Sequence, residues 1–267
     1  MNRLRACAYS GLLALLPATG LTADRWEASN LGNDDSYYTR NELVHGSVQH
    51  GHDLEPDPPG VTDRDWMSLR TRARHSYEAR VTSGFWTIPS GCSGSCATFN
   101  RVDSVGAILT AGVKDGVTSN LYPSTLGVRW IAPVSANEYL VAAGQVDYSA
   151  LDTYDVDLYD TTYFMPRFNN SGTQVTVLVI QNTRDALVTG EIYFYNGAGT
   201  LLSAQPLSIP AQGVQVLNSA TIPELLGQSG SVTIAQLGGY GALAGKGVAL
   251  EPSTGFTFDT AFAPLPR

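Results

Sequence analysis

The sequence predicts an all-β protein built from two consecutive antiparallel β-sandwiches. Short segments alternate apolar and polar residues with the period of two that is typical of half-buried strands. Clusters of Gly, Pro, Asn and Ser separate these segments, as turns do in sandwiches. No segment combines a sustained helical period with helix caps, so helices are not expected to contribute to either core.

The first 23 residues predict a cleaved secretory signal peptide. Arg3 and Arg5 precede an apolar stretch at 12–16, and small residues follow up to Ala23. This order is typical of export signals, and the apolar stretch is too short to anchor the chain in a bilayer. We therefore expect a secreted protein, located in the periplasm, at the cell surface or outside the cell, with no membrane span.

Strand patterns fill the first module, which we place at residues 24–162. The segments 76–81 and 153–158 show the clearest alternation, with aromatic and aliphatic residues on one face and charged residues on the other. Further strands are predicted at 42–48, 65–69, 105–111, 126–131 and 138–142.

The second module, residues 163–267, is predicted to be an immunoglobulin-like sandwich of about seven strands. Residues 175–180 are almost continuously apolar, which predicts a central strand covered on both faces. Residues 191–202 surround an Asn-Gly-Ala-Gly turn and predict a hairpin. Further strands are predicted at 214–217, 231–236, 247–250 and 256–262, with one helical turn at 222–226. No flexible linker separates the modules near Thr162, so we expect them to abut.

Composition excludes several classes of protein. Only 15% of residues are charged, and 16 Lys and Arg stand against 24 Asp and Glu, for a net charge of -8. Such a chain offers no basic surface for phosphates, so no nucleic-acid partner is expected. The charge is unevenly divided, because residues 24–162 have a net charge of -9 and residues 163–267 only -1. Any function that uses charge or metal is therefore expected in the first module.

The first module resembles the bacterial pre-peptidase C-terminal domain over residues 30–160. The matching segments are N-D-D-S-Y at 33–37, L-V-H-G-S-V at 43–48, D-R-D-W-M-S-L at 63–69, Y-E-A-R-V at 77–81, A-P at 132–133, E-Y-L-V-A-A at 138–143 and Y-D-V-D-L at 154–158. The resemblance implies a jelly-roll-like sandwich of the kind appended to secreted enzymes, with calcium or an extracellular polymer as ligand. The insert at 85–99 departs from the family pattern. The second module resembles only generic immunoglobulin-like modules of secreted bacterial proteins, which implies no activity.

Acidic residues of the first module are candidate calcium ligands. Asp34, Asp35, Asp63 and Asp65 supply the hard carboxylate oxygens that suit calcium, although their spacing is not that of an EF-hand loop. Calcium is accordingly a candidate cofactor, and the sequence establishes no other. The alternative is that Asp65 stabilises a turn while Trp66 fills the core.

Two histidines in the first module are candidate ligands for a transition metal. His50 and His52 are separated by one residue and would point to the same side of a strand, where Asp53 could complete the site. The alternative is an exposed loop at 51–60, which contains three prolines and would leave these side chains solvated.

The cysteines predict a local disulfide. Cys7 would leave with the signal peptide, so the mature chain keeps Cys92 and Cys96, which an oxidising compartment would join. A zinc site would need two further ligands nearby. Beside this loop, Phe85 and Trp86 are candidates for an exposed ligand-binding platform, with core packing as the alternative.

Catalytic motifs are sparse in this sequence. All four histidines precede residue 76, and no Gly-x-Ser-x-Gly motif lies between a strand and a helix. The favoured interpretation is a secreted, non-catalytic protein that mediates extracellular or cell-surface interaction by binding a polymer or a protein. The alternatives are a metal-dependent hydrolase using the His/Asp cluster of the first module and a structural spacer.

Overall fold

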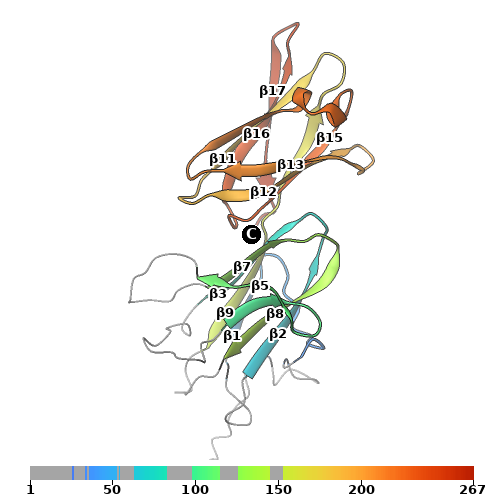
Figure 1. Ribbon diagram of the computed structural model, residues 1–267. Helices are drawn as coiled ribbons and strands as arrows, with labels where there is room; N and C mark the ends of the chain where they lie inside the picture. The colour runs from blue at the N-terminus through green and yellow to red at the C-terminus, as the bar shows by residue number, and fades with distance from the viewer. Residues whose placement is uncertain are drawn as a thin grey trace, which may run out of the picture.

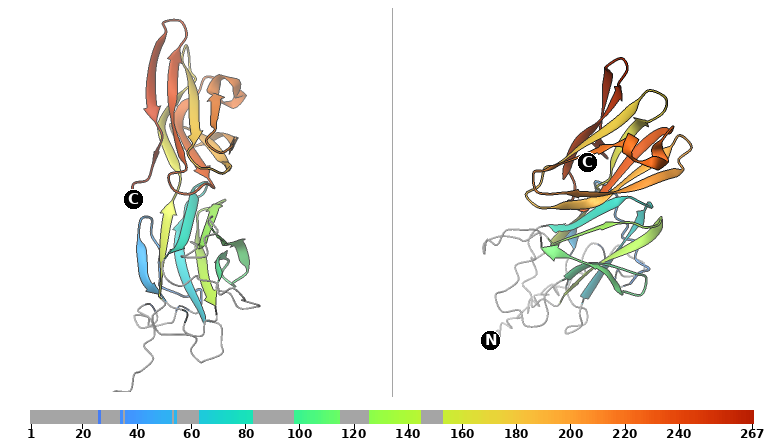
Figure 2. Two further views of the ribbon diagram at one scale, coloured as in Figure 1. Left: turned by 90° about the vertical axis from the view of Figure 1, so that its left-hand side faces the viewer. Right: turned by 45° about the horizontal axis from the view of Figure 1, so that its top comes forward.

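The computed structural model describes residues 26, 34, 36–52, 54, 63–82, 98–114, 126–144 and 153–267. In this part of the chain almost all regular structure is β, arranged in four sheets whose paired strands are antiparallel, which confirms the predicted all-β sandwich class. The sheets form two modules stacked end to end (Figures 1 and 2). No helix among these residues has the length and apolar character needed to cross a bilayer.

The N-terminal module contains two sheets. The β3 sheet has the order β1 (Val48–His52), β9 (Tyr154–Asp160), β3 (Ser76–Thr82), β7 (Leu126–Ile131) and β6 (Val113–Lys114). The β8 sheet has the order β2 (Asp63–Thr71), β8 (Ala136–Gly144), β4 (Thr98–Val102) and β5 (Ile108–Ala111). Apolar side chains from both sheets meet in one core that extends from Leu43 to Leu158.

Alternation along β3 determines which side chains enter this core. Tyr77, Ala79 and Val81 face the interior, as predicted, so Glu78 and Arg80 lie on the outer face of the sheet. Glu78 is nevertheless only 2% exposed. A buried carboxylate on an outer face indicates that something covers this part of the sheet.

The C-terminal module also contains two sheets. The β12 sheet has the order β13 (Leu201–Ile209), β12 (Val188–Asn196), β15 (Ser229–Gln236), β10 (Tyr163–Asn169) and β18 (Ala263–Pro264). The β11 sheet has the order β14 (Val214–Asn218), β11 (Val175–Asn182), β16 (Leu243–Glu251) and β17 (Phe256–Ala261). The 3-10 turns η1 (Ser219–Thr221) and η2 (Pro223–Leu225) follow β14, and Pro223 occupies the first position of η2. A second core, from Tyr163 to Leu243, lies between these sheets.

The prediction that residues 175–180 are covered on both faces is wrong. β11 is central in its sheet, but its burial alternates: Leu178 and Ile180 are buried in the core, whereas Val177 and Val179 are half-exposed. The continuous apolar run therefore gives the β11 sheet a second apolar face. Nothing among the described residues covers that face with another layer of strands.

Turn chemistry explains where predicted strands begin and end. The hairpin between β12 and β13 turns at Asn196, whose Oδ1 accepts hydrogen bonds from Ala198 N and Thr200 N at 3.0 and 2.9 Å. The strand predicted at 105–111 begins only at Ile108, because Asp103 Oδ1 accepts hydrogen bonds from two backbone N–H groups in a turn. The strand predicted at 42–48 is also displaced, since β1 begins at Val48.

The sequence patterns did not indicate the strands β4, β6, β10 and β18. β10 contains Pro166, which ordinarily argues against a strand inside a sheet. The pairing of β10 with β15 shifts register between Met165 and Phe168, and this irregularity accommodates the proline.

A two-residue connection joins the modules. β9 ends at Asp160 and β10 begins at Tyr163, so only Thr161 and Thr162 lie between them, and both are buried. A connection this short and this buried keeps the modules in contact.

Candidate functional site

The structure separates the two histidines that the sequence places together. His50 has a side chain that is 68% exposed, and its Nδ1 lies 3.0 Å from Asp155 Oδ2, whereas the side chain of His52 is fully buried. Gly51 between them has φ +77, and the pairing of β1 with β9 is irregular there. The expectation that both side chains share one side of a strand is therefore wrong, because a bulge reverses the alternation.

His52 belongs to a buried aromatic and polar cluster. Its ring stacks between Trp26 and Tyr154, with centroid separations of 4.9 and 5.2 Å, and its Nε2 lies 3.1 Å from Gln49 Oε1. Burial lowers the pKa of His52 to about 3, so the ring is neutral at physiological pH. Its Nδ1 lies 3.8 Å from Asp65 Oδ2, which also accepts a hydrogen bond from the Tyr154 hydroxyl. The structure thus brings His52 from one predicted metal site next to Asp65 from the other.

Asp34 and Asp63, two of the other acidic candidates, each accept a hydrogen bond from a residue nearby in the sequence. Asp34 Oδ2 accepts a hydrogen bond from Asn41 Nδ2 at 3.0 Å, and Asp63 Oδ1 accepts one from Arg64 N at 2.7 Å. Among the residues that the structure describes, no three His, Cys, Asp or Glu side chains are grouped closely enough to hold a metal ion. Six of the predicted site residues lie outside the described residues: Asp35, Asp53, Phe85, Trp86, Cys92 and Cys96.

An aromatic series occupies the outer face of the β8 sheet. Trp66 on β2 contacts Tyr139 on β8 edge to face at a centroid distance of 6.0 Å, and Tyr139 contacts Tyr37 in the same way at 6.3 Å. Tyr37 in turn lies against Tyr38 at 4.1 Å. Exposure increases along the series, from 5% at Trp66 to 75% at Tyr38. We call these four side chains the aromatic face.

Local structure positions the aromatic face. Alternation along β2 directs Met67 and Leu69 into the core, and therefore Trp66 outward. A Cβ at Gly106, whose φ is +85, would lie 3.6 Å from the Trp66 ring, so the turn between β4 and β5 covers one edge of the indole. The alternative that Trp66 fills the core agrees with the structure, because Trp66 is buried with Val102 and Val141 in a small hydrophobic cluster separate from the main core of the module.

Polar groups border the exposed end of the aromatic face. The Tyr37 hydroxyl donates a hydrogen bond to the Tyr38 hydroxyl at 2.6 Å, which raises the pKa of Tyr37. Arg70 shares the outward side of β2 with Trp66, and its Nε lies 3.1 Å from Glu42 Oε1 in an exposed ion pair. Exposed rings beside hydroxyl, guanidinium and carboxylate groups can stack on a ligand and hydrogen-bond to its polar substituents.

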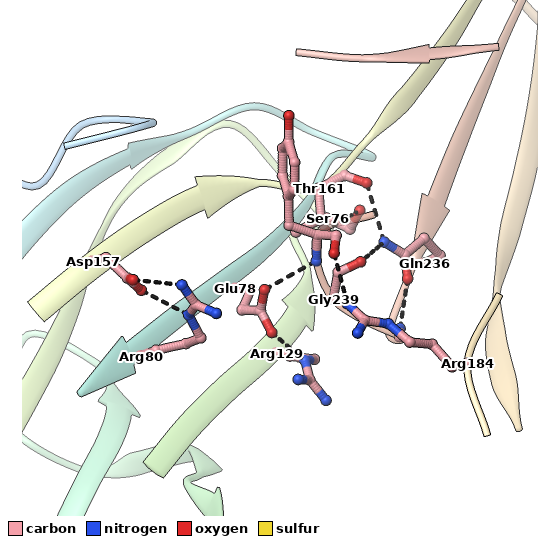
Figure 3. Close-up of polar contacts among 11 residues, drawn as sticks. Ser76, Glu78, Arg80, Arg129, Asp157, Thr161, Arg184, Gln236 and Gly239 are labelled. Atoms are coloured by element: carbon pink, nitrogen blue, oxygen red, sulfur yellow. Dashed lines mark hydrogen bonds and ion pairs between the residues drawn. The ribbon is translucent and has the colours of Figure 1, made fainter. Parts of the chain in front are cut away.

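The second unusual polar region is the joint between the modules. Glu78 on the outer face of β3 accepts a hydrogen bond from Arg129 Nε at 2.7 Å and another from Tyr240 N of the C-terminal module at 3.0 Å (Figure 3). Gly239, with φ +85, allows this approach, since a Cβ there would lie 2.5 Å from Glu78 Oε1. Gln236 Nε2 adds a hydrogen bond to Thr161 O at 3.2 Å. The cover over Glu78 is therefore the 238–241 loop of the other module.

The last residues of the chain also contact both modules. His45 Nδ1 accepts a hydrogen bond from Asp160 N at 2.9 Å, and its Nε2 lies 2.8 Å from Pro266 O. The Arg267 guanidinium lies over the rings of Tyr159 and Tyr240, at 4.7 and 4.4 Å from their centroids. His45 thus contributes to the contact between the modules.

The sequence analysis did not predict that the four residues of the aromatic face lie together, although one pattern pointed to an outward-facing Trp66. The alternation in residues 63–71 places Trp66 opposite Met67 and Leu69, so an outward tryptophan could have been inferred. The association of Tyr37 with Tyr139 depends on tertiary structure. In comparisons with known proteins, no family model, curated protein or solved structure matches the chain.

Proposed function

We propose that the protein is a secreted, non-catalytic binding protein whose N-terminal module recognises an extracellular polysaccharide. The observation that supports this most directly is the aromatic face, which leads from buried Trp66 to exposed Tyr38 across the outer side of the β8 sheet. Tyr37 and Tyr38 form the exposed end of this series, and their rings are supported from the sheet by Tyr139 and the buried Trp66. Exposed aromatic side chains held in place by a rigid sheet are typical of a binding surface.

A polysaccharide fits this surface better than other polymers. The faces of aromatic rings are electron-rich and attract the partly positive C–H groups on the flat side of a sugar ring. The neighbouring hydroxyls of Tyr37 and Tyr38 and the Arg70–Glu42 pair can exchange hydrogen bonds with sugar hydroxyls. A nucleic acid is disfavoured by the net charge of -8, as is a strongly acidic polymer.

The test is retention of the purified protein on insoluble polysaccharides, with cellulose, chitin and bacterial peptidoglycan as the probes. Tyr38→Ala is expected to weaken binding to the retained polymer roughly tenfold, since one stacked ring contributes about 1–1.5 kcal/mol. Tyr37→Phe keeps the ring but removes its hydrogen bond to Tyr38, and should weaken binding less.

Phe256→Ala is the matched control, because Phe256 is an exposed aromatic residue of the other module. Equal loss of binding in Tyr38→Ala and Phe256→Ala would contradict the assignment of the site. Absence of binding to all three polymers, with binding to a proline-rich peptide instead, would reassign the aromatic face to a protein partner. Absence of both would favour the spacer function.

A further inference from the structure

The outer face of the β11 sheet carries a group of aliphatic side chains from three neighbouring strands. Register places Val179 of β11 between Val216 of β14 and Lys246 of β16, and Val177 between Asn218 and Val248. Because side chains alternate along each strand, these residues share the side of the sheet that faces away from the core. We call this the valine face, and its members are Val175, Val177, Val179, Val216, Val248 and Leu250.

The same module provides an internal comparison. On the outer face of the β12 sheet, register places Thr189 opposite Ser208 and Glu191 opposite Pro206, as expected for a surface in water, and Tyr193 opposite Ala204 further along. The valine face has aliphatic residues at the equivalent positions, and Val216 is 63% exposed. A flat surface of this composition on a soluble module marks an interaction site.

From this geometry we infer that the valine face joins two copies of this chain in a symmetric dimer. Charge is the first reason for choosing a second copy as the partner. The C-terminal module has a net charge of -1, so two such modules can meet with little repulsion, whereas the N-terminal modules, at -9 each, must stay apart. A two-fold axis that lies between the two sheets and perpendicular to their strands brings the C-terminal modules together and keeps the N-terminal modules apart. Because β16 and β17 run roughly along the molecule, the N-terminal modules of such a dimer point in opposite directions (Figure 2).

The rim of the valine face is the second reason. Lys246 and Asp259 form an exposed ion pair at the β17 side, with Lys246 in the cross-strand row of Val179 and Asp259 in the row of Val177 and Val248. A two-fold axis that passes between these rows sets β16 against β16 of the other copy, so Lys246 of each copy lies diagonally across from Asp259 of the other, one strand to the side. The face is therefore complementary to itself in charge as well as in apolar character.

The size of the surface indicates how strong this dimer is. Four strands about 4.8 Å apart and about six residues long at 3.3 Å per residue cover roughly 400 Å² in projection. This is about half of the roughly 800 Å² per partner that a specific interface of standard size buries, and it is typical of weak, transient association. We therefore expect a dissociation constant in the micromolar range.

Sedimentation equilibrium of the full chain at about 2–200 µM spans this range and tests the dimer. The wild-type protein is expected to change from monomer to dimer across it. Val216→Glu should raise the dissociation constant at least tenfold, since a carboxylate would be buried against valines. The control is Ser208→Glu on the outer face of the β12 sheet, which should leave the constant unchanged, and circular dichroism confirms that both variants fold.

Charge reversal tests the two-fold arrangement separately. Lys246→Asp and Asp259→Lys should each weaken self-association, and an equimolar mixture of the two should associate again, because each chain supplies the charge that the other lacks. A wild-type protein that stays monomeric at all concentrations would overturn the proposal and leave the valine face to a different protein. A dimer that Val216→Glu does not weaken would overturn it as well, by placing the interface elsewhere.

Discussion

Replacing Glu78 with Gln tests whether the two modules unfold as one unit. In the native protein the two oxygens of Glu78 accept hydrogen bonds from Arg129 Nε and from Tyr240 N. Glutamine has the same shape but only one acceptor oxygen, so one of these two donors would face an N–H₂ group. The substitution also removes the negative charge beside Arg129.

The magnitude follows from these two losses. A hydrogen bond to a charged group contributes about 1.5–3 kcal/mol, and a buried donor left unpaired costs about 1–3 kcal/mol. The side chain of Arg129 is 27% exposed, so water screens part of the lost attraction. We therefore expect Glu78→Gln to reduce the free energy of unfolding by about 3 kcal/mol, near the lower end of the summed range of about 2.5–6 kcal/mol.

The distribution of tryptophans supplies the assay. All four tryptophans precede residue 131, so their fluorescence reports on the N-terminal module, while far-ultraviolet circular dichroism reports on both modules. In urea the two signals of the wild-type protein should change together, as a cooperative unit requires. In Glu78→Gln the fluorescence midpoint should fall by about 1 M, for a denaturant dependence of about 3 kcal/mol/M, and should separate from the dichroism midpoint.

The control is Glu42→Gln, which removes the exposed partner of Arg70. Surface pairs of this kind contribute little, so a change below about 0.5 kcal/mol is expected. The reasoning is refuted if Glu78→Gln behaves like Glu42→Gln, or if the two signals already disagree in the wild-type protein.

Two further substitutions test the joint and the buried cluster. Gly239→Ala and Gly241→Ala both place a side chain at positive φ, but only at Gly239 would the new Cβ meet another group, at 2.5 Å from Glu78 Oε1. Gly239→Ala should therefore lower the urea midpoint more than Gly241→Ala, and equal midpoints would contradict the proposed contact. His52 binds a proton near pH 6.5 in the unfolded chain but only near pH 3 when folded, so the free energy of unfolding falls as the pH drops below 6.5. Between pH 7.5 and pH 5 the wild-type protein should lose about 2 kcal/mol of its free energy of unfolding through this group. His52→Phe lacks the group, so its urea midpoint should fall less than the wild-type midpoint over the same pH range.

Local alternation predicts the strands and their inward faces well, because the side-chain period of a strand is a property of a few consecutive residues. The pattern of Tyr77, Ala79 and Val81 is sufficient to place them in the core. The same reasoning fails at His50 and His52, where a bulge at Gly51 interrupts the period. A glycine inside a strand pattern was a signal that this interruption was possible.

Features that depend on tertiary packing were beyond sequence reasoning. The hydrogen bond from Tyr240 N to Glu78 joins residues 162 positions apart, and nothing in either local segment indicates the other. Glu78 appears in the sequence as the polar half of an alternating strand, for which exposure is the normal expectation. Its burial follows from the short connection at Thr161 and Thr162, which holds the 238–241 loop of the C-terminal module over Glu78.

The continuous run at 175–180 illustrates a different limit. An apolar strand face predicts that the face is covered, but it does not indicate whether the cover belongs to the same chain. Here the described sheets cover one face only, so the same observation that makes the sequence prediction wrong is the basis for inferring a dimer.

The aromatic face and the valine face have a joint consequence if both proposals hold. The two faces lie on different modules, and a two-fold axis through the valine faces would place the two aromatic faces at opposite ends of the dimer. One dimer would then engage a long polysaccharide at two points, and the second contact would form at a high effective concentration. Because the joint at Glu78 limits movement of one module against the other, the distance between the two sites would be nearly constant.

Val216→Glu should consequently reduce retention on an insoluble polysaccharide while leaving the affinity for a short oligosaccharide unchanged. Equal loss for the long and the short ligand would show that the valine face contributes to binding directly, and not through dimerisation.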